Sequence, residues 1–295
     1  MSVGVVHIEQ VESYQSVGSR VIAVILMLAG CASCHGRHVS NGCEVWQVAS
    51  VQPSQVSSKS LVFKKPPYGT QLRDGDAVFF VGNSFLRWNH RPLDQWIRAI
   101  GLRQTPPLRI KTGTDIVFGN TPLAGFLEHR ATQEALRSGK YKVFVLQGEE
   151  YEPVDHKAAF HQSVRDFHQA ITAAGGHTVL FMTWEFRFRQ FINQLASSYD
   201  EIGTELGIPV VPVGIIYKDC ECQPYGEQRP FWLTDGDLHE NEKGTAVNAF
   251  ATFQMLTGIE TAGENFRALG NTNDDGSMRY FAKMTWNRVA PRLGF

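Results

Sequence analysis

The sequence predicts an α/β fold in which helices cover both faces of a five-stranded parallel sheet. Two observations lead to this fold class. Short runs of β-branched and aromatic residues are apolar without alternation, as in strands that are buried on both sides. Amphipathic segments that end at glycine lie between these runs, so strand and helix alternate along the chain. Right-handed crossovers then place helices on both faces of the sheet.

Five segments have the composition of strands. Four are strongly apolar, and the second, at residues 108–111, is weaker. In chain order, the predicted strands are Ala77–Val81, Leu108–Lys111, Val143–Gln147, Thr178–Met182 and Pro209–Val213.

Five segments between and after these runs have helical patterns. Proline opens the first, and glycine at position 101 is expected to end it. Most of the others also stop at a glycine or just before one. The predicted helices are Pro92–Ile100, Leu123–Arg137, Lys157–Ala174, Phe188–Leu206 and Asn241–Leu256, with a further helix over Tyr280–Val289 in the C-terminal tail.

Composition limits the function classes. The 295 residues carry 28 Lys and Arg against 29 Asp and Glu, a formal net charge of −1. This balance gives no electrostatic basis for binding nucleic acid or an anionic membrane surface. Hydrophobic residues make up 43% of the chain, which excludes disorder for its bulk.

The N-terminal region predicts an export signal and a lipid anchor. Residues 21–29 read VIAVILMLA, a run too short to span a bilayer but typical of a signal peptide. Leu-Ala-Gly-Cys at its end resembles a bacterial lipobox, which would make Cys31 the lipid attachment site and explain the odd count of five cysteines. The alternative is a buried strand or short helix. The predicted organisation is a signal peptide at 1–30, a tether at 31–70, the main α/β domain at 71–262 and a docked extension at 263–295, in the bacterial cell envelope.

Candidate chemistry lies where the first predicted strand ends. Asn83 and Ser84 follow this strand directly, after a glycine. A serine on such a turn can expose its hydroxyl next to free backbone N–H groups, which a nucleophile needs. An ordinary turn or helix cap is the alternative interpretation.

A second cluster lies just before the last helix of the domain. His239 is preceded by Asp235 and Asp237 at four and two residues. Ligands of open α/β sheets bind at the carboxyl ends of the strands, so this loop and Ser84 are expected at the same edge. A histidine oriented by a carboxylate and facing a serine is the arrangement of a nucleophilic triad.

These segments resemble the SGNH (GDSL-type) hydrolase superfamily, in the subgroup that reads GNSF. Val-Gly-Asn-Ser-Phe-Leu at 81–86 is similar to its first block, and Asp-Gly-Asp-Leu-His at 235–239 to its last. Weaker similarities lie between them, so the resemblance covers about residues 75–260. It implies a flavodoxin-like three-layer α/β/α sandwich and hydrolysis of esters, often on carbohydrates.

The resemblance also implies roles for single residues. Ser84 is the nucleophile, His239 the general base, and the backbone N–H groups of Ser84 and Gly119 are oxyanion donors. Gln147 stands where the family has a donor asparagine, and its amide is the expected substitute. The family's carboxylate lies three residues before the histidine, where this chain has Gly236, so Asp235 or Asp237 would complete the triad, and Asp235 is slightly favoured.

Substrate contacts are expected from Asn83, Glu149 and Trp184 near the strand ends. Core packing is an open alternative for Trp184 and for its aromatic neighbours Phe186, Phe188 and Trp232. The predicted function is that of a serine esterase acting on an acylated carbohydrate, without a metal or other cofactor. The alternatives are an acyltransferase with the same site and a catalytically silent glycan-binding lipoprotein.

Overall fold

The structure is a computed structural model that describes residues 71–88, 92–221, 233–236, 238–261 and 277–294. The predictions for the signal peptide, Cys31, the tether, Asp237 and Trp232 lie outside these residues. In the part of the chain that is described, no helix combines the length and the apolar character needed to cross a bilayer.

A five-stranded parallel sheet in the order β2-β1-β3-β4-β5 forms the centre of the fold. The order in which strands are added reverses once. β2 lies on one side of β1, and the later strands follow one another on its other side. The strands are β1 (Ala77–Gly82), β2 (Lys111–Ile116), β3 (Val143–Leu146), β4 (His177–Phe181) and β5 (Val210–Val211). A separate antiparallel pair, β6 (Thr234–Asp235) and β7 (His239–Glu240), follows later in the chain.

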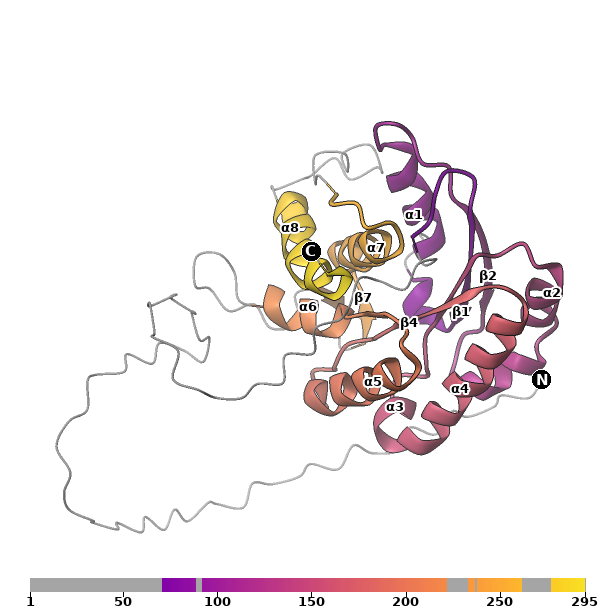
Figure 1. Ribbon diagram of the computed structural model, residues 1–295. Helices are drawn as coiled ribbons and strands as arrows, with labels where there is room; N and C mark the ends of the chain where they lie inside the picture. Colours follow the sequence, from indigo (N-terminus) through magenta and orange to yellow (C-terminus); the bar gives the residue numbers. More distant parts are fainter. Residues whose placement is uncertain (1–70, 89–91, 222–232, 237, 262–276, 295) are drawn as a thin grey trace, which may run out of the picture. The chain divides into compact units, whose positions relative to one another are not determined.

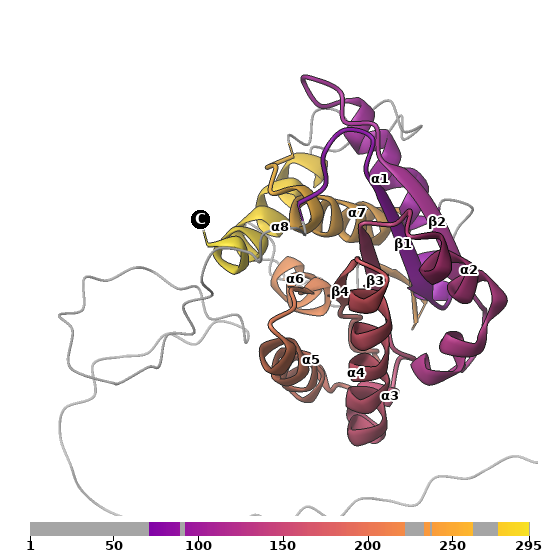
Figure 2. The same ribbon diagram turned by 45° about the vertical axis from the view of Figure 1, so that its right-hand side comes forward.

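Helices cover both faces of the sheet, as predicted, and the fold is a three-layer α/β/α sandwich (Figures 1 and 2). One layer contains α1 (Leu93–Leu102), α7 (Glu242–Thr257) and α8 (Ser277–Leu293). The other contains α4 (Lys157–Ala173) and α5 (Ile192–Leu206). The remaining helical segments are η1 (Ser84–Leu86), η2 (Leu123–Glu128), α2 (Arg130–Ser138), α3 (Glu152–Asp155) and α6 (Val213–Cys220).

Helix α7 is buried on every side. All residues from Gly244 to Thr257 are buried, a pattern that only a central helix shows. Helix α8, from the predicted C-terminal extension, packs along it, and Gln254 Nε2 donates a hydrogen bond to the Ala282 carbonyl at 3.1 Å. Helix α8 thereby contributes to the burial of α7.

Several predicted boundaries are wrong. The second strand begins at Lys111 instead of ending there. Helix α1 continues through Gly101, which was predicted to end it. Glycine stands there for a packing reason, since the Leu108 carbonyl oxygen lies 2.4 Å from where a Cβ would stand. The predicted helix over 123–137 is divided at His129, whose backbone is extended. The predicted helix over 188–206 begins only at Ile192, because residues 186–189 form a tight turn.

Candidate active site

Ser84 lies immediately beyond the carboxyl end of β1, at the point where the sheet order reverses. Gly82 ends the strand, and a Cβ there would stand 2.5 Å from Gln147 Oε1, so the residue must be glycine. Asn83 then caps the short helix η1, its Oδ1 accepting the backbone N–H of Phe85 at 3.1 Å. Ser84 is the first residue of this helix. In open sheets the reversal point is where ligands bind.

His239 reaches the same place from the other end of the domain. Its Nε2 lies 2.8 Å from the Ser84 hydroxyl oxygen, although 155 residues separate the two in sequence. When the hydroxyl donates this hydrogen bond, the imidazole carries its own proton on Nδ1. The pair has the geometry in which a histidine accepts the proton of an attacking serine.

Two aromatic rings stack on the His239 imidazole. The Trp88 ring is nearly parallel to it, with 3.7 Å between centroids and 10° between planes. The Phe85 ring lies 5.3 Å away at 29°. Burial lowers the pKa of the His239 imidazole below its ordinary value of 6.5. His239 is therefore neutral at pH 7, the form that a general base requires.

The backbone beside His239 is fixed by a buried tryptophan. Trp184 is 1% exposed, and its Nε1 donates to the carbonyl of Leu238 at 2.9 Å. Its ring also stacks on Tyr217 at 4.6 Å. Of the two interpretations left open for Trp184, the structure supports core packing.

Carboxylates near His239 occupy two different environments. Asp235 is exposed and stands opposite His239 in the β6–β7 register, which places both side chains on one face of the pair. Glu240 is buried, accepts a hydrogen bond from the Trp88 backbone N–H, and burial raises its pKa well above the ordinary range. Because Asp237 lies outside the described residues, the choice between Asp235 and Asp237 stays a prediction.

A buried polar network supports the turn that carries Ser84. The Asn83 backbone N–H donates to Gln147 Oε1 at 2.9 Å, and Asn83 Nδ2 donates to Glu150 Oε2 at 3.0 Å. Gln147 Nε2 in turn donates to the Gly148 carbonyl. Burial raises the pKa of the Glu150 carboxyl. The network joins the ends of β1 and β3.

The predicted oxyanion donors lie around this edge. Gly119 follows β2 in the left-handed region, with φ of +105° and open space where a Cβ would stand. The loop is drawn to β1 by a hydrogen bond from Val117 N–H to the Gly82 carbonyl at 3.1 Å. Gln147 places its amide against Asn83 and Gly148. Oxyanion binding by Gly119 and Gln147 stays a prediction.

Glu149 has a structural contact of its own. Its carboxylate accepts the backbone N–H groups of Tyr151 at 2.9 Å and Glu152 at 2.8 Å. It therefore satisfies donors at the start of α3. Substrate binding by Asn83 and Glu149 is untested.

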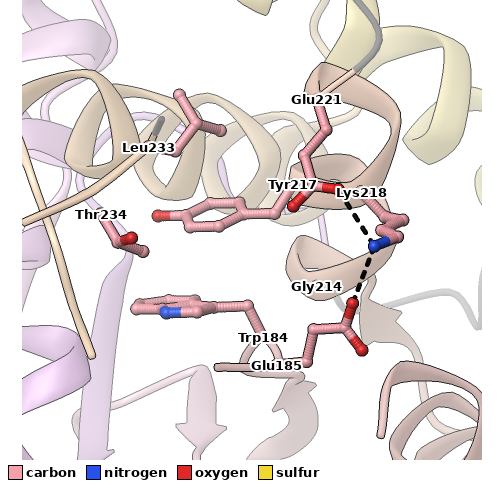
Figure 3. Close-up of a pocket in the computed structure, with 8 residues that line it drawn as sticks. All are labelled: Trp184, Glu185, Gly214, Tyr217, Lys218, Glu221, Leu233 and Thr234. Atoms are coloured by element: carbon pink, nitrogen blue, oxygen red, sulfur yellow. Dashed lines mark hydrogen bonds and ion pairs between the residues drawn. The ribbon is translucent and has the colours of Figure 1, made fainter. Parts of the chain in front are cut away.

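A pocket beside Trp184 is lined by residues of α6 and by Leu233 and Thr234 (Figure 3). Lys218 pairs there with Glu185 and Glu221, at 3.0 Å each, and Tyr217 stacks on Trp184. Neither Ser84 nor His239 lines it. Within the described ranges, no group of three or more His, Cys, Asp or Glu side chains is placed to hold a metal ion.

Some site residues were not predicted from the sequence. Trp88 was missed, because nothing in a tryptophan four residues after the serine indicates that it will stack on a distant histidine. Glu150 was also missed, because its contact with Asn83 spans 67 positions. The pattern Gly-Glu-Glu after a buried strand was the one available signal.

No protein-family model matches the chain, and no curated protein matches it. Solved structures do. The acetylxylan esterase Axe2 from Geobacillus stearothermophilus aligns over 64% of this chain and 97% of its own, at 11% identity and a TM-score of 0.52. LAE5, an α/β hydrolase enzyme from the metagenome of Lake Arreo in Spain, aligns over 64% and 98%, at 12% identity and a TM-score of 0.50.

These similarities cover 64% of this chain and nearly the whole of each neighbour. At such low identity they establish the fold and nothing finer. The five-stranded, flavodoxin-like α/β/α sandwich predicted from the sequence is confirmed, and the chain has the fold found in these hydrolases.

Proposed function

We propose that this protein is an SGNH-type serine esterase that removes acyl groups from an acylated carbohydrate. The observation that carries the proposal is the 2.8 Å contact between the Ser84 hydroxyl and His239 Nε2 at the reversal point of the sheet. A histidine kept neutral by burial supports the same conclusion, since it is ready to accept a proton at pH 7.

The reaction proceeds in two steps. His239 takes the Ser84 proton as the oxygen attacks the ester carbonyl, and the alcohol leaves with that proton. Water, activated by the same imidazole, then releases the acyl group from Ser84. Backbone N–H groups of Ser84 and Gly119, with the Gln147 amide, bind the oxyanion, and Asp235 or Asp237 orients the imidazole.

Two properties of the structural neighbours support this assignment. Axe2 is an acetylxylan esterase, and the catalytic mutants of it that have been solved replace one serine and one histidine by alanine. A serine and a histidine are also the residues that meet at the sheet edge of this chain. The carbohydrate side of the proposal rests on this parallel.

Replacement of Ser84 tests the proposal. Ser84→Ala is expected to lower kcat for 4-nitrophenyl acetate by about 10⁴-fold or more, and to abolish labelling by a fluorophosphonate. Ser197→Ala, at an exposed serine on α5, is the matched control and keeps both. The unfolding temperature of each variant is measured alongside. A Ser84→Ala protein that still turns over the ester would refute the assignment.

We also propose that the protein is held at a bacterial membrane by a lipid on Cys31, as the lipobox-like segment indicates. Expression in a bacterial host with labelled palmitate is expected to label the wild-type chain. The Cys31→Ser variant is expected to remain unlabelled, and equal labelling of both would contradict lipid attachment at Cys31.

A further inference from the structure

Two exposed aromatic side chains follow strands of the sheet: Phe118 after β2, 58% exposed, and Phe188 after β4. Phe188 is 63% exposed, the highest value among the large hydrophobic side chains that the structure describes as exposed. It follows β4, and the carboxyl ends of β4 and β1 lie at the same edge of the parallel sheet. Single exposed hydrophobic side chains are common on protein surfaces, so what distinguishes Phe188 is its ring contacts toward the site.

The turn that carries Phe188 is held firmly. Phe186 and Arg189 exchange two backbone hydrogen bonds of 3.1 Å, which leaves Arg187 and Phe188 at the tip. Arg189 pairs with Asp155 of α3, Nη1 to Oδ2 at 2.6 Å, and its guanidinium lies 5.0 Å from the centre of the Tyr151 ring. These contacts fix where the exposed ring stands.

A series of near-parallel rings connects Phe188 to the catalytic histidine. Phe85 stacks on His239 at 29°, and Phe186 is oriented 16° from Phe85 at a centroid distance of 6.0 Å. The Phe188 ring stacks on that of Phe186, with 5.5 Å between centroids and 23° between planes. The exposed ring is therefore two ring contacts away from the residue that follows Ser84.

We infer that Phe188 is a stacking subsite for a sugar ring of the acylated carbohydrate, an inference that rests on the function proposed above. An aromatic face, with its negative charge density, attracts the C–H groups of a pyranose. The face of one aromatic ring matches the size of one sugar unit, whereas a stable protein interface buries about 800 Å² on each partner. A long acyl chain would need a concave pocket, not one exposed ring.

Comparison of substrates in Phe188 variants tests this inference. The ratio of kcat/KM for acetylated xylotetraose or acetylated mannotetraose to kcat/KM for 4-nitrophenyl acetate is measured for each protein. Phe188→Ala and Phe188→Leu are expected to lower this ratio about three- to tenfold through KM, because Leu is apolar but has no flat face. Phe188→Trp is expected to preserve it. Leu102→Ala removes a side chain of similar exposure, 58%, at the far end of α1 and should leave the ratio unchanged.

The outcomes separate this inference from the proposed function. A wild-type protein that hydrolyses 4-nitrophenyl acetate but neither oligosaccharide overturns the sugar subsite and leaves the esterase standing. If the ratio for Phe188→Ala equals the wild-type ratio, the sugar subsite is also overturned and the esterase assignment stands. If Phe188→Ala instead lowers activity toward 4-nitrophenyl octanoate relative to the acetate, the ring binds an acyl chain and the inference is wrong. A wild-type protein inactive on every ester overturns both proposals together.

Discussion

Ser84 and His239 are positioned by different kinds of structure. The serine turn, formed by Asn83 and η1, continues directly from a buried central strand and is tied to β3 by buried hydrogen bonds. The histidine hairpin, formed by β6 and β7, is outside the five-stranded sheet. It meets the site through ring stacking, a hydrogen bond from Trp184 to the Leu238 carbonyl and one from the Trp88 N–H to Glu240.

This difference has a physical consequence. Buried hydrogen bonds are directional, and a lost partner leaves an unsatisfied polar group, so the serine turn is costly to disturb. Stacked rings tolerate small displacements, because dispersion and area burial depend weakly on angle. Changes at the serine turn should therefore affect stability, whereas changes at the histidine hairpin should affect chemistry.

The largest effect is expected from Asn83→Ala. This change leaves the Phe85 N–H and the buried Glu150 carboxyl without their partner, which should lower the free energy of unfolding by about 2–3 kcal/mol. Thermal unfolding should then shift down by roughly 5–10 °C. Differential scanning calorimetry measures the shift.

Asn83→Ser is the matched control for this change. A serine side chain keeps an acceptor for the Phe85 N–H but does not reach Glu150 as an amide donor does. Its loss of stability should be intermediate. An Asn83→Ala protein that unfolds at the wild-type temperature would show that the network does not stabilise the serine turn.

A smaller effect is expected from Trp88→Ala, and it concerns the pH profile. Burial lowers the pKa of His239, so the acid limb of kcat/KM in the wild-type protein should lie below pH 6.5. Below that pKa the imidazole is protonated and accepts no proton from Ser84. Removal of the Trp88 ring exposes the imidazole, so its pKa should rise toward 6.5 and the limb should move to higher pH.

The plateau of the same profile gives a second measurement. Without the stacked ring the imidazole gains rotational freedom, and kcat/KM above the limb should fall by about three- to tenfold. Trp88→Phe keeps a ring, so its kcat/KM should lie between those of the wild-type protein and Trp88→Ala. An acid limb that moves to lower pH in Trp88→Ala would contradict the assignment of the shift to burial.

The sequence predicted the central strands well and the edge poorly. β1, β3 and β4 are buried in almost every residue, so their apolar runs are unambiguous. β2 lies at the edge and is mostly half-exposed, and its Lys-Thr-Gly-Thr sequence carries no apolar run. The helix boundary at 188–191 was wrong because a tertiary contact, Arg189 with Asp155, stabilises a turn there.

The candidate site shows the same division. Ser84 and His239 could be predicted because both follow from their place at the strand ends and from the order of motifs along the chain. Contacts between side chains remote in sequence were beyond reach. Trp88 on His239 is one such contact, and Asn83 with Glu150 is another. The triad carboxylate remains between Asp235 and Asp237.

Helix α7 connects the strand that carries His239 to the C-terminal helix. It begins two residues after β7, with Asn241 accepting the N–H groups of Lys243 and Gly244 at 3.0 Å each. Helix α8 packs along it and contributes to its burial. The C-terminal helix is thereby part of the support of His239, and removal of α8 is expected to expose α7 and to loosen the position of that side chain.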